Sequence, residues 1–388
     1  MVLHFERGEF ERRLTNARAA LRERDIAALL VFAPESQYYL TGFDTSGYVF
    51  FQCLVLTADD GPVTLLTRRP DLQQARHTST IEDIRVWYDT VGADPTEALQ
   101  DILAEKGLGG ARVGVEMESF GLNARDYDRL RCRFAGWCDL VDGSDVVRGL
   151  RQRKSPAEIA YVRSAAAIAD DMLEAMLAAT GPGAFEGDIA AAGQDVLFRA
   201  GGDPAPGGPV LGSGPRALLI RSTSGFRHLD PVDQLTTEFA SSYRRYTACL
   251  MRTVAVGEGN ERQRRMFEVT RDAMAAMTEA VSPGRPLGEI DDAHRQVYDR
   301  AGYGEARMAA CGYTLGATYR PSWMDVPHLL YSGNPAPAEP GMVLFLHAIL
   351  IDAPNRLAMS LGQTVLVTET GREVLTRLVP DYIVCRSP

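Results

Sequence analysis

The sequence predicts a mixed α/β (α+β) protein of two domains, a small N-terminal domain over residues 1–148 and a C-terminal domain over residues 149–388. The first observation is length, because 388 residues exceed what one hydrophobic core ordinarily supports. The second is the alternation of helical patterns with continuous apolar runs in the N-terminal domain, which is typical of α/β domains. The third is an internal repeat in the C-terminal domain, in which each copy pairs helices with strand-like sequence.

The N-terminal domain begins with an amphipathic pattern over residues 9–25, where apolar side chains recur at the helical period. The run IAALLVFAP follows, and because no polar residue interrupts it, we expect a strand covered on both faces. Two further strands, VFFQCLVLT and PVTLLT, are separated by the turn signal ADDG. The remaining predicted elements are helices over 68–77 and 95–106 and the short strand VGVEM.

The polar, basic stretch RGLRQRKSPAEIA, residues 148–160, marks the domain boundary. Within it, Ser155 suits a helix N-cap, Pro156 the first helical position and Glu158 the third. Serine and glutamate at these positions form a capping box, and proline there gives up no needed hydrogen bond. The sequence therefore predicts that the C-terminal domain opens with a helix.

The repeat spans residues 157–254 and 262–368. PGAFEGDIAAAGQDVLFRAGG, starting at Pro182, matches PGRPLGEIDDAHRQVYDRAGY, starting at Pro283, at a constant offset of 101 residues without a gap. Two unrelated helices after Pro-Gly turns are the plainer explanation, but the paired glycines favour a duplicated helix–turn–helix unit. Strand-like sequences follow each copy: LTTEFA and YTACLMRT after the first, MVLFLHAILI and GQTVLVT after the second.

Alignment of LTTEFA with LFLHAI places Glu238 opposite His347. If a pseudo-twofold axis relates the copies, these two polar side chains face one cavity from matching strands. A buried carboxylate beside an imidazole suits catalysis, because one group can act as nucleophile or base while the other transfers a proton. A buried salt bridge that ties the two copies together is the structural alternative.

Two neighbouring segments supply further candidates for substrate binding. Arg221 interrupts the apolar run ALLIRST, which we expect to be a strand; it either forms an internal ion pair or binds a substrate carboxylate. The segment CGYTLGATYRPSWMD, residues 311–325, combines glycines with aromatic side chains and is either a pocket wall or a glycine-rich sheet edge. The candidates in this segment are Tyr313, Tyr319, Trp323 and Asp325.

Composition excludes several classes of partner. The net charge is −10 and the pI about 5.2, whereas nucleic acids and anionic membranes recruit clustered Lys and Arg. No apolar run approaches the roughly 18–20 residues of a membrane span, and the N-terminus lacks the apolar segment of a secretory signal. The six cysteines are scattered without a C-x-x-C pair, which indicates reduced thiols. We therefore expect a cytoplasmic protein that binds neither nucleic acid nor membrane.

Four segments of the chain carry a family resemblance: YYLTGF (38–43), LRQRKSPAEIAYVRSAA (150–166), PGMVLFL (340–346) and TVLVTETG (364–371). Through them the chain resembles the creatinase / aminopeptidase P superfamily over nearly its whole length. The resemblance implies a creatinase-like N-terminal domain, a duplicated C-terminal domain of the pita-bread fold, and a homodimer. It also implies that the loop from Asp44 to Tyr48 reaches toward the active site of the other subunit.

Peptidases of this superfamily bind two divalent metals through two Asp, one His and two Glu. The resemblance places these five ligands at Glu238, Cys249, Tyr313, His347 and Gly362. Only the first of these positions carries a carboxylate, and the last carries no side chain. The resemblance therefore implies no metal and no other cofactor, and metallo-aminopeptidase or prolidase activity is not expected. A single zinc held by the Glu, Cys and His remains the alternative.

Creatinase and ectoine hydrolase are metal-free branches of the superfamily, and the chain looks closer to ectoine hydrolase. The shared features are Glu238 in place of the first Asp, the SYRRY turn (242–246), the Ile220-Arg221 pair, and the pattern GY-x-[IL]-G-x-x-Y-x-P-x-W over 312–323. The departures are Ser322, where that branch has an acid, together with Thr247 and Cys249, all of which we expect to line the pocket.

The resemblance thus implies a metal-independent hydrolase of a non-peptide C–N bond in a small amidine, cyclic amidine or amide. Glu238 would attack or activate water and His347 would transfer the proton. Arg221, Tyr313 and Trp323 would hold the substrate, with Cys249, Tyr319 and Asp325 as further contacts. A cyclase or lyase on the same scaffold is one alternative, and a catalytically dead module that binds a peptide or protein is the other.

Overall fold

The computed structural model describes residues 3–325 and 329–387. The chain divides into two compact units, Met1–Arg151 and Gln152–Pro388. The division falls at the end of helix α6 (Ser144–Gln152), which contains the predicted boundary at residue 148. Among the helices of the described residues, none is both long and apolar enough to cross a membrane. All six cysteines are free thiols.

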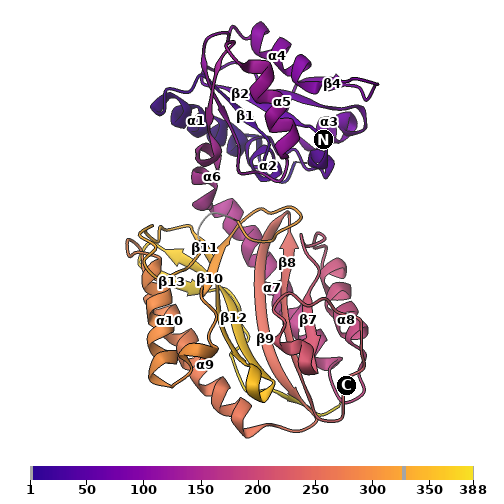
Figure 1. Ribbon diagram of the computed structural model, residues 1–388, viewed down its shortest axis with the longest axis vertical. Helices are drawn as coiled ribbons and strands as arrows, with labels where there is room; N and C mark the ends of the chain where they lie inside the picture. Colours follow the sequence, from indigo (N-terminus) through magenta and orange to yellow (C-terminus); the bar gives the residue numbers. More distant parts are fainter. Residues whose placement is uncertain (1–2, 326–328, 388) are drawn as a thin grey trace. The chain divides into compact units, whose positions relative to one another are not determined.

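The first unit is a mixed sheet with helices on both faces (Figure 1). Its strands are β1 (Ala28–Val31), β2 (Cys53–Thr57), β3 (Thr64–Arg68), β4 (Asp83–Trp87), β5 (Arg112–Val115) and β6 (Asp139–Asp142). Its helices, besides α6, are α1 (Arg7–Glu23), α2 (Pro34–Thr41), α3 (Leu72–Thr78), α4 (Pro95–Glu105) and α5 (Ala124–Phe134), with the short 3₁₀ helices η1 (Gly47–Val49) and η2 (Arg69–Asp71). The strand order is β4-β3-β2-β1-β5-β6.

Side chains of the central strand β1 alternate between two apolar cores. Leu29 and Val31 pack with α1, α2, α3 and α6, whereas Ala28 and Leu30 pack with α4 and α5. All four are fully buried, so the predicted strand covered on both faces is confirmed. Strands β4 and β6 and helix α5 were not predicted from the sequence. Both strands are sheet edges with partly exposed, charged residues, which obscures the apolar alternation that marks a strand.

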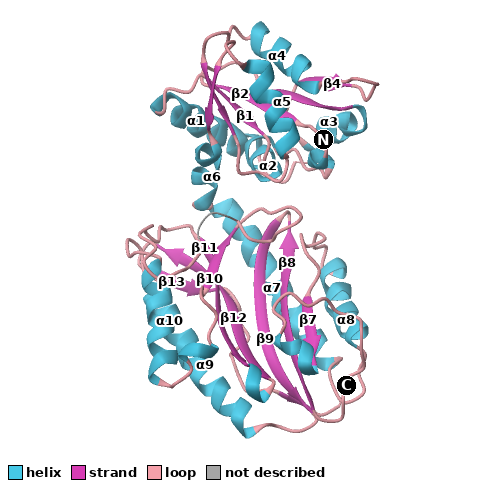
Figure 2. Ribbon diagram, viewed as in Figure 1, coloured by secondary structure: helices cyan, strands magenta, loops and turns pink. Residues whose placement is uncertain are grey.

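The second unit is built on one large, mainly antiparallel sheet (Figure 2). Its strands are β7 (Val210–Ser213), β8 (Asp233–Tyr243), β9 (Tyr246–Val256), β10 (Gly312–Leu315), β11 (Val343–Asp352), β12 (Leu357–Thr368), β13 (Gly371–Val374) and β14 (Val384–Cys385). The main order is β10-β11-β12-β9-β8-β7, with β13 paired to β12 and β14 paired to β9. Its helices are α7 (Pro156–Ala178), α8 (Glu186–Arg199), α9 (Glu261–Ala280) and α10 (Gly288–Arg300), with the 3₁₀ helices η3 (Gly214–Leu218), η4 (Gly304–Ala306) and η5 (Ala353–Asn355).

The two copies of the repeat have the same order of elements. In the first, α7 and α8 pack on the β7–β9 half of the sheet, and in the second, α9 and α10 pack on the β10–β12 half (Figure 1). The paired glycines adopt the same left-handed conformation: φ is 80° at Gly183 and 81° at Gly284, 75° at Gly201 and 77° at Gly302. L-residues with a side chain rarely adopt this conformation, which explains why glycine stands at both members of each pair.

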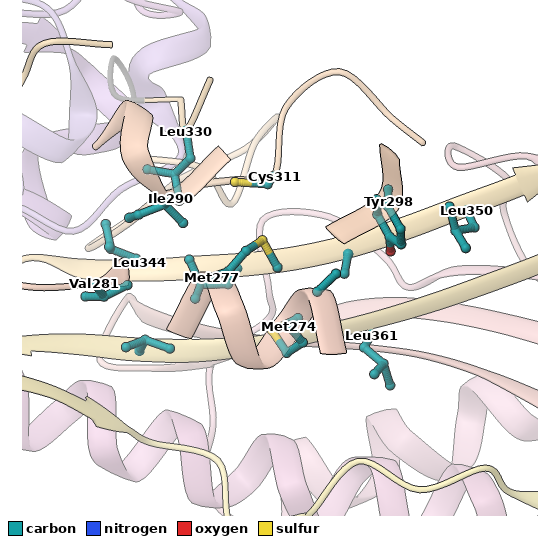
Figure 3. Packing of buried hydrophobic residues seen from close by; sticks show 14 of the residues in the cluster. Met274, Met277, Val281, Ile290, Tyr298, Cys311, Leu330, Leu344, Leu350 and Leu361 are labelled. Carbon is teal, nitrogen blue, oxygen red and sulfur yellow. The ribbon is translucent and has the colours of Figure 1, made fainter. Parts of the chain in front are cut away.

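Each copy has its own apolar core. In the second copy Met274 and Met277 of α9 and Ile290 and Tyr298 of α10 pack against Leu344 of β11 and its neighbours (Figure 3).

The start of α7 is fixed by the predicted capping box: the Ser155 side chain accepts from the Glu158 backbone N–H, and the Glu158 side chain accepts from the Ser155 N–H. This prediction is therefore confirmed.

Candidate active site

A cavity of about 440 Å³ opens in the second unit, lined by residues of both copies of the repeat. Strands β7 and β8 of the first copy and β10 and β11 of the second contribute lining residues. Loops also line it, with residues 220–221 before β8, residues 308–310 before β10 and residues 321–324 before β11. Among the described residues, the polar lining side chains are Arg221, Glu238, Tyr313, Ser322, Trp323 and His347. The sheet thus brings the predicted carboxylate and imidazole to one cavity.

Glu238 lies in the middle of β8, paired with Val210 of β7 on one side and Met251 of β9 on the other. Its side chain is half-buried and faces the cavity. Burial raises the pKa of Glu238 above that of an ordinary glutamate, while the hydrogen bond from Tyr313 and the positive charge of Arg221 lower it. The protonation of Glu238 therefore depends on the hydrogen bond from Tyr313 and on the charge of Arg221.

Two aromatic side chains form a chain of hydrogen bonds that ends on Glu238. The Trp323 indole Nε1–H donates to the Tyr313 hydroxyl at 2.7 Å, and that hydroxyl donates to Glu238 Oε1 at 2.9 Å. Because the indole can only donate, it directs the phenol proton toward the carboxylate. Burial raises the pKa of Tyr313 well above its ordinary value, so the phenol keeps its proton at neutral pH.

His347 occupies β11, opposite Gly362 of β12. Its backbone N–H donates to the Cys311 carbonyl at 2.8 Å, and its ring lies 5.9 Å from the Tyr313 ring. Burial lowers the pKa of His347 to about 4, with a further contribution from the charge of His294, so the imidazole is neutral at pH 7. No described residue hydrogen-bonds its buried Nδ1.

Arg221 lines the cavity, but the strand predicted for ALLIRST is wrong. Gly214–Leu218 forms η3, and the chain turns at Ile220 and Arg221 before β8 begins at Asp233. The apolar run has strand composition, yet its backbone turns, with the Leu219 N–H donating to the Arg216 carbonyl and the Ser222 N–H donating to the Leu219 carbonyl. The Arg221 side chain is exposed, and its charge acts on Glu238 across the cavity.

Three further candidates do not line the cavity within the described part of the chain. Cys249 is fully buried on β9, next to Tyr313 and Glu238, and burial raises the pKa of its thiol well above the ordinary value. Tyr319 is buried with the Arg245 guanidinium 5.1 Å above its ring. Asp325 is buried against Lys154, with 3.7 Å between Nζ and Oδ2. These side chains support the wall of the site from behind.

Of the three departures from ectoine hydrolase, Ser322 lines the cavity, whereas Thr247 and Cys249 are buried away from it. The cavity also has an apolar wall that was not predicted from the sequence, formed by Met308, Ala310, Leu329 and Ile349. Alternation along β11 gave a signal for Ile349, which lies two residues after His347 and so on the same face. The others lie in loops, where no periodicity exists.

The residues at the five family ligand positions do not fit a pair of divalent metals. Among the described residues, no group of three or more His, Cys, Asp or Glu side chains lies close enough to hold a metal ion. The space beside Gly362 is also filled, because a Cβ there would lie 2.5 Å from the Phe345 ring and 2.7 Å from the Met251 Cβ. We therefore derive no catalytic step through a metal.

Fold and site together define a protein of the pita-bread class with a creatinase-like N-terminal domain. The model of metallopeptidase family M24 matches residues 160–369, and that of the creatinase/prolidase N-terminal domain matches residues 13–153. The first match covers more than half of the chain, so the chain belongs to metallopeptidase family M24. The predicted superfamily and fold class are thereby confirmed, and the predicted hydrolase is supported at the level of the family.

Similar proteins agree in fold but differ in named activity. An uncharacterised hydrolase/peptidase of Sinorhizobium fredii is 28% identical over 393 residues, 99% of each chain. The ectoine hydrolase of Halomonas elongata is 27% identical over 394 residues, 96% of each chain. The solved structure of the dipeptidase PepE from Mycobacterium ulcerans has a TM-score of 0.84 and 24% identity, covering 99% of this chain and 100% of that one. This last likeness concerns the fold alone.

Proposed function

We propose that this protein hydrolyses a non-peptide C–N bond in a small amidine, cyclic amidine or amide that carries a carboxylate, and that it does so without a metal. The observation that carries the proposal is the convergence of Glu238, Tyr313, His347 and Arg221 on one cavity. A volume of about 440 Å³ suits a small molecule. Similarity to a relative named ectoine hydrolase supports a substrate of this size.

Glu238 acts at the electrophilic carbon of the C–N bond. As a base, it removes a proton from water while the water oxygen bonds to that carbon; as a nucleophile, its own oxygen bonds to the carbon and water releases the product afterwards. The hydrogen bond from Tyr313 occupies Oε1, which leaves Oε2 for the reaction. Tyr313 also stabilises the ionised form of the carboxylate, the form that both routes require.

His347 supplies the proton that the leaving nitrogen needs when the C–N bond breaks. With a pKa of about 4 the imidazole is neutral at pH 7, so its unprotonated ring nitrogen can accept the proton that Glu238 has taken from water and then donate it to the leaving nitrogen. The ring lies beside Tyr313 on the cavity wall. Glu238 thus acts at the carbon and His347 at the leaving nitrogen, from matching strands of the two copies of the repeat.

Arg221 binds the carboxylate of the substrate. It is the cationic side chain among the described cavity-lining residues, and apolar residues such as Ile220, Met308 and Ile349 form much of the remaining wall. A guanidinium recognises a carboxylate through two parallel hydrogen bonds, which orients the substrate as well as holding it. This arrangement favours a small acid over an uncharged amide.

A screen of cyclic amidine acids and guanidino acids, before and after extensive treatment with a chelator, tests the proposal. We expect turnover of at least one compound, unchanged by the chelator, with less than stoichiometric metal by elemental analysis. Glu238→Gln should abolish turnover while the same compound still binds. Stoichiometric zinc or manganese that turnover requires would overturn the metal-free mechanism, and cleavage of Xaa-Pro dipeptides instead would overturn the substrate class.

A further inference from the structure

One buried carboxylate hydrogen-bonds both ends of the loop that carries Arg221. Glu186, the first residue of α8, is fully buried. Its Oε1 accepts from the Ser213 N–H at 2.9 Å and from the Ser213 hydroxyl at 2.7 Å, and its Oε2 accepts from the Phe226 N–H at 3.2 Å. Ser213 and Phe226 lie on either side of Arg221, so Glu186 joins the two ends of the segment from 213 to 226, here called the arginine loop.

Arg216 extends this contact to the middle of the arginine loop. Its guanidinium donates to Glu186 Oε2 at 2.5 Å and to the Ser222 hydroxyl at 2.9 Å, and it stacks 4.8 Å above the Phe226 ring. Ser222 directly follows Arg221 and is buried. The chain of contacts therefore runs from Glu186 through Arg216 to the residue next to Arg221.

The second copy of the repeat shows that the fold does not need a charge at this place. Glu186 N–H donates to the Arg227 carbonyl at 3.1 Å, and at the repeat offset Leu287 N–H donates to the Ala336 carbonyl at 2.8 Å. The two residues thus have equivalent backbone pairing. Leu287 is fully buried in an apolar core. A buried carboxylate is costly unless it is hydrogen-bonded, so its presence at this position in the first copy, where the second copy has leucine, indicates a role specific to the first copy.

We propose that Glu186 and Arg216 are positioning residues that hold Arg221 in place for the carboxylate of the substrate, and thereby set the preference of the site for acids. This inference rests on the proposed function of the cavity, in which Arg221 binds that carboxylate. Glu186 is suited to the role because it stays charged: burial alone would raise its pKa, but the donors from Ser213, Phe226 and Arg216 lower it below the ordinary value.

The test compares Glu186→Gln, Arg216→Gln and Arg221→Gln, with Asp195→Asn as control. Asp195 lies on the same helix α8 in an exposed pair with Arg199, remote from the arginine loop. Binding of a cyclic amidine acid and of its uncharged carboxamide is measured by calorimetry for each protein. We expect wild type and control to prefer the acid, and each of the three variants to lose that preference by about five- to tenfold.

A double variant, Glu186→Gln with Arg221→Gln, should lose little more than Arg221→Gln alone, because both act through one contact. If Glu186→Gln weakened binding of the acid and of the carboxamide equally, Glu186 would have only a structural role, and the inference would be overturned. If wild type bound neither compound, the proposed function would fail first, and hydrogen–deuterium exchange would still decide this inference. Exchange in residues 213–226 should rise in Glu186→Gln and not in the control; unchanged exchange would refute the pinning.

Discussion

Tyr313→Phe removes one oxygen atom and tests the chain of hydrogen bonds that ends on Glu238. The Tyr313 hydroxyl donates to Glu238 Oε1 at 2.9 Å and lowers the pKa of that carboxyl. A hydrogen bond to a charged group is worth roughly 1.5–3 kcal/mol. Because this hydrogen bond favours the ionised form, its loss raises the pKa of Glu238. Phenylalanine keeps the ring, so its packing on Phe345 and His347 is retained.

The pH profile of kcat/KM reports this change, because the acid limb follows the free enzyme's essential base. If Glu238 acts ionised, the limb moves to higher pH in Tyr313→Phe, and kcat/KM on that limb falls by roughly tenfold or more. Tyr246→Phe is the matched control: Tyr246 is also buried and donates to a glutamate, Glu158 Oε1, at 2.7 Å, away from the cavity. An acid limb that stays in place in Tyr313→Phe, or moves equally in both variants, would show that Tyr313 does not tune the catalytic base.

Three further outcomes are expected. Glu238→Gln should lower kcat by about 10²–10⁴-fold in steady-state assays, because the amide cannot accept a proton or attack carbon; a smaller loss would exclude Glu238 as base. His347 has a pKa of about 4 when folded, below the 6.5 of the unfolded chain, so unfolding takes up a proton between these values and stability falls as pH drops from 6.5 to 4. Urea titrations across that range should show a loss of at most about 3 kcal/mol in wild type and less in His347→Gln. Gly362→Glu should unfold at lower temperature and still bind no manganese by calorimetry, since its Cβ would overlap Phe345; tight manganese binding would contradict the steric argument.

The fold could largely be predicted because its patterns are local. The alternation of apolar runs and helices indicated the first unit, and the gapless match with its paired glycines indicated the repeat, because a left-handed turn favours glycine wherever it recurs. The arginine loop could not be predicted in this way. Its apolar residues 217–220 have the composition of a strand, whereas the contacts that hold the two ends of the loop come from Glu186, which lies outside it in the sequence.

The difference between local sequence patterns and contacts from elsewhere in the chain also explains which site residues could be predicted. Glu238 and His347 were found because a polar residue in a buried strand has few explanations and the repeat related the two. Tyr319 and Asp325 share a glycine-rich segment with Trp323, but only the tertiary packing against Arg245 and Lys154 decides which of these side chains turn away from the cavity.

The repeat also gives a physical reason why this site works with so few polar groups. A duplicated unit places equivalent backbone positions around one cavity, and each copy can then differ there without altering the fold. The first copy carries charge, with Glu238 on its strand and Glu186 behind its loop. The second carries neutral donors, with His347 and the Trp323–Tyr313 chain. Of these neutral groups Tyr313 hydrogen-bonds the Glu238 carboxylate directly, which stabilises its ionised form from within the protein, as the metal-free mechanism that we propose requires.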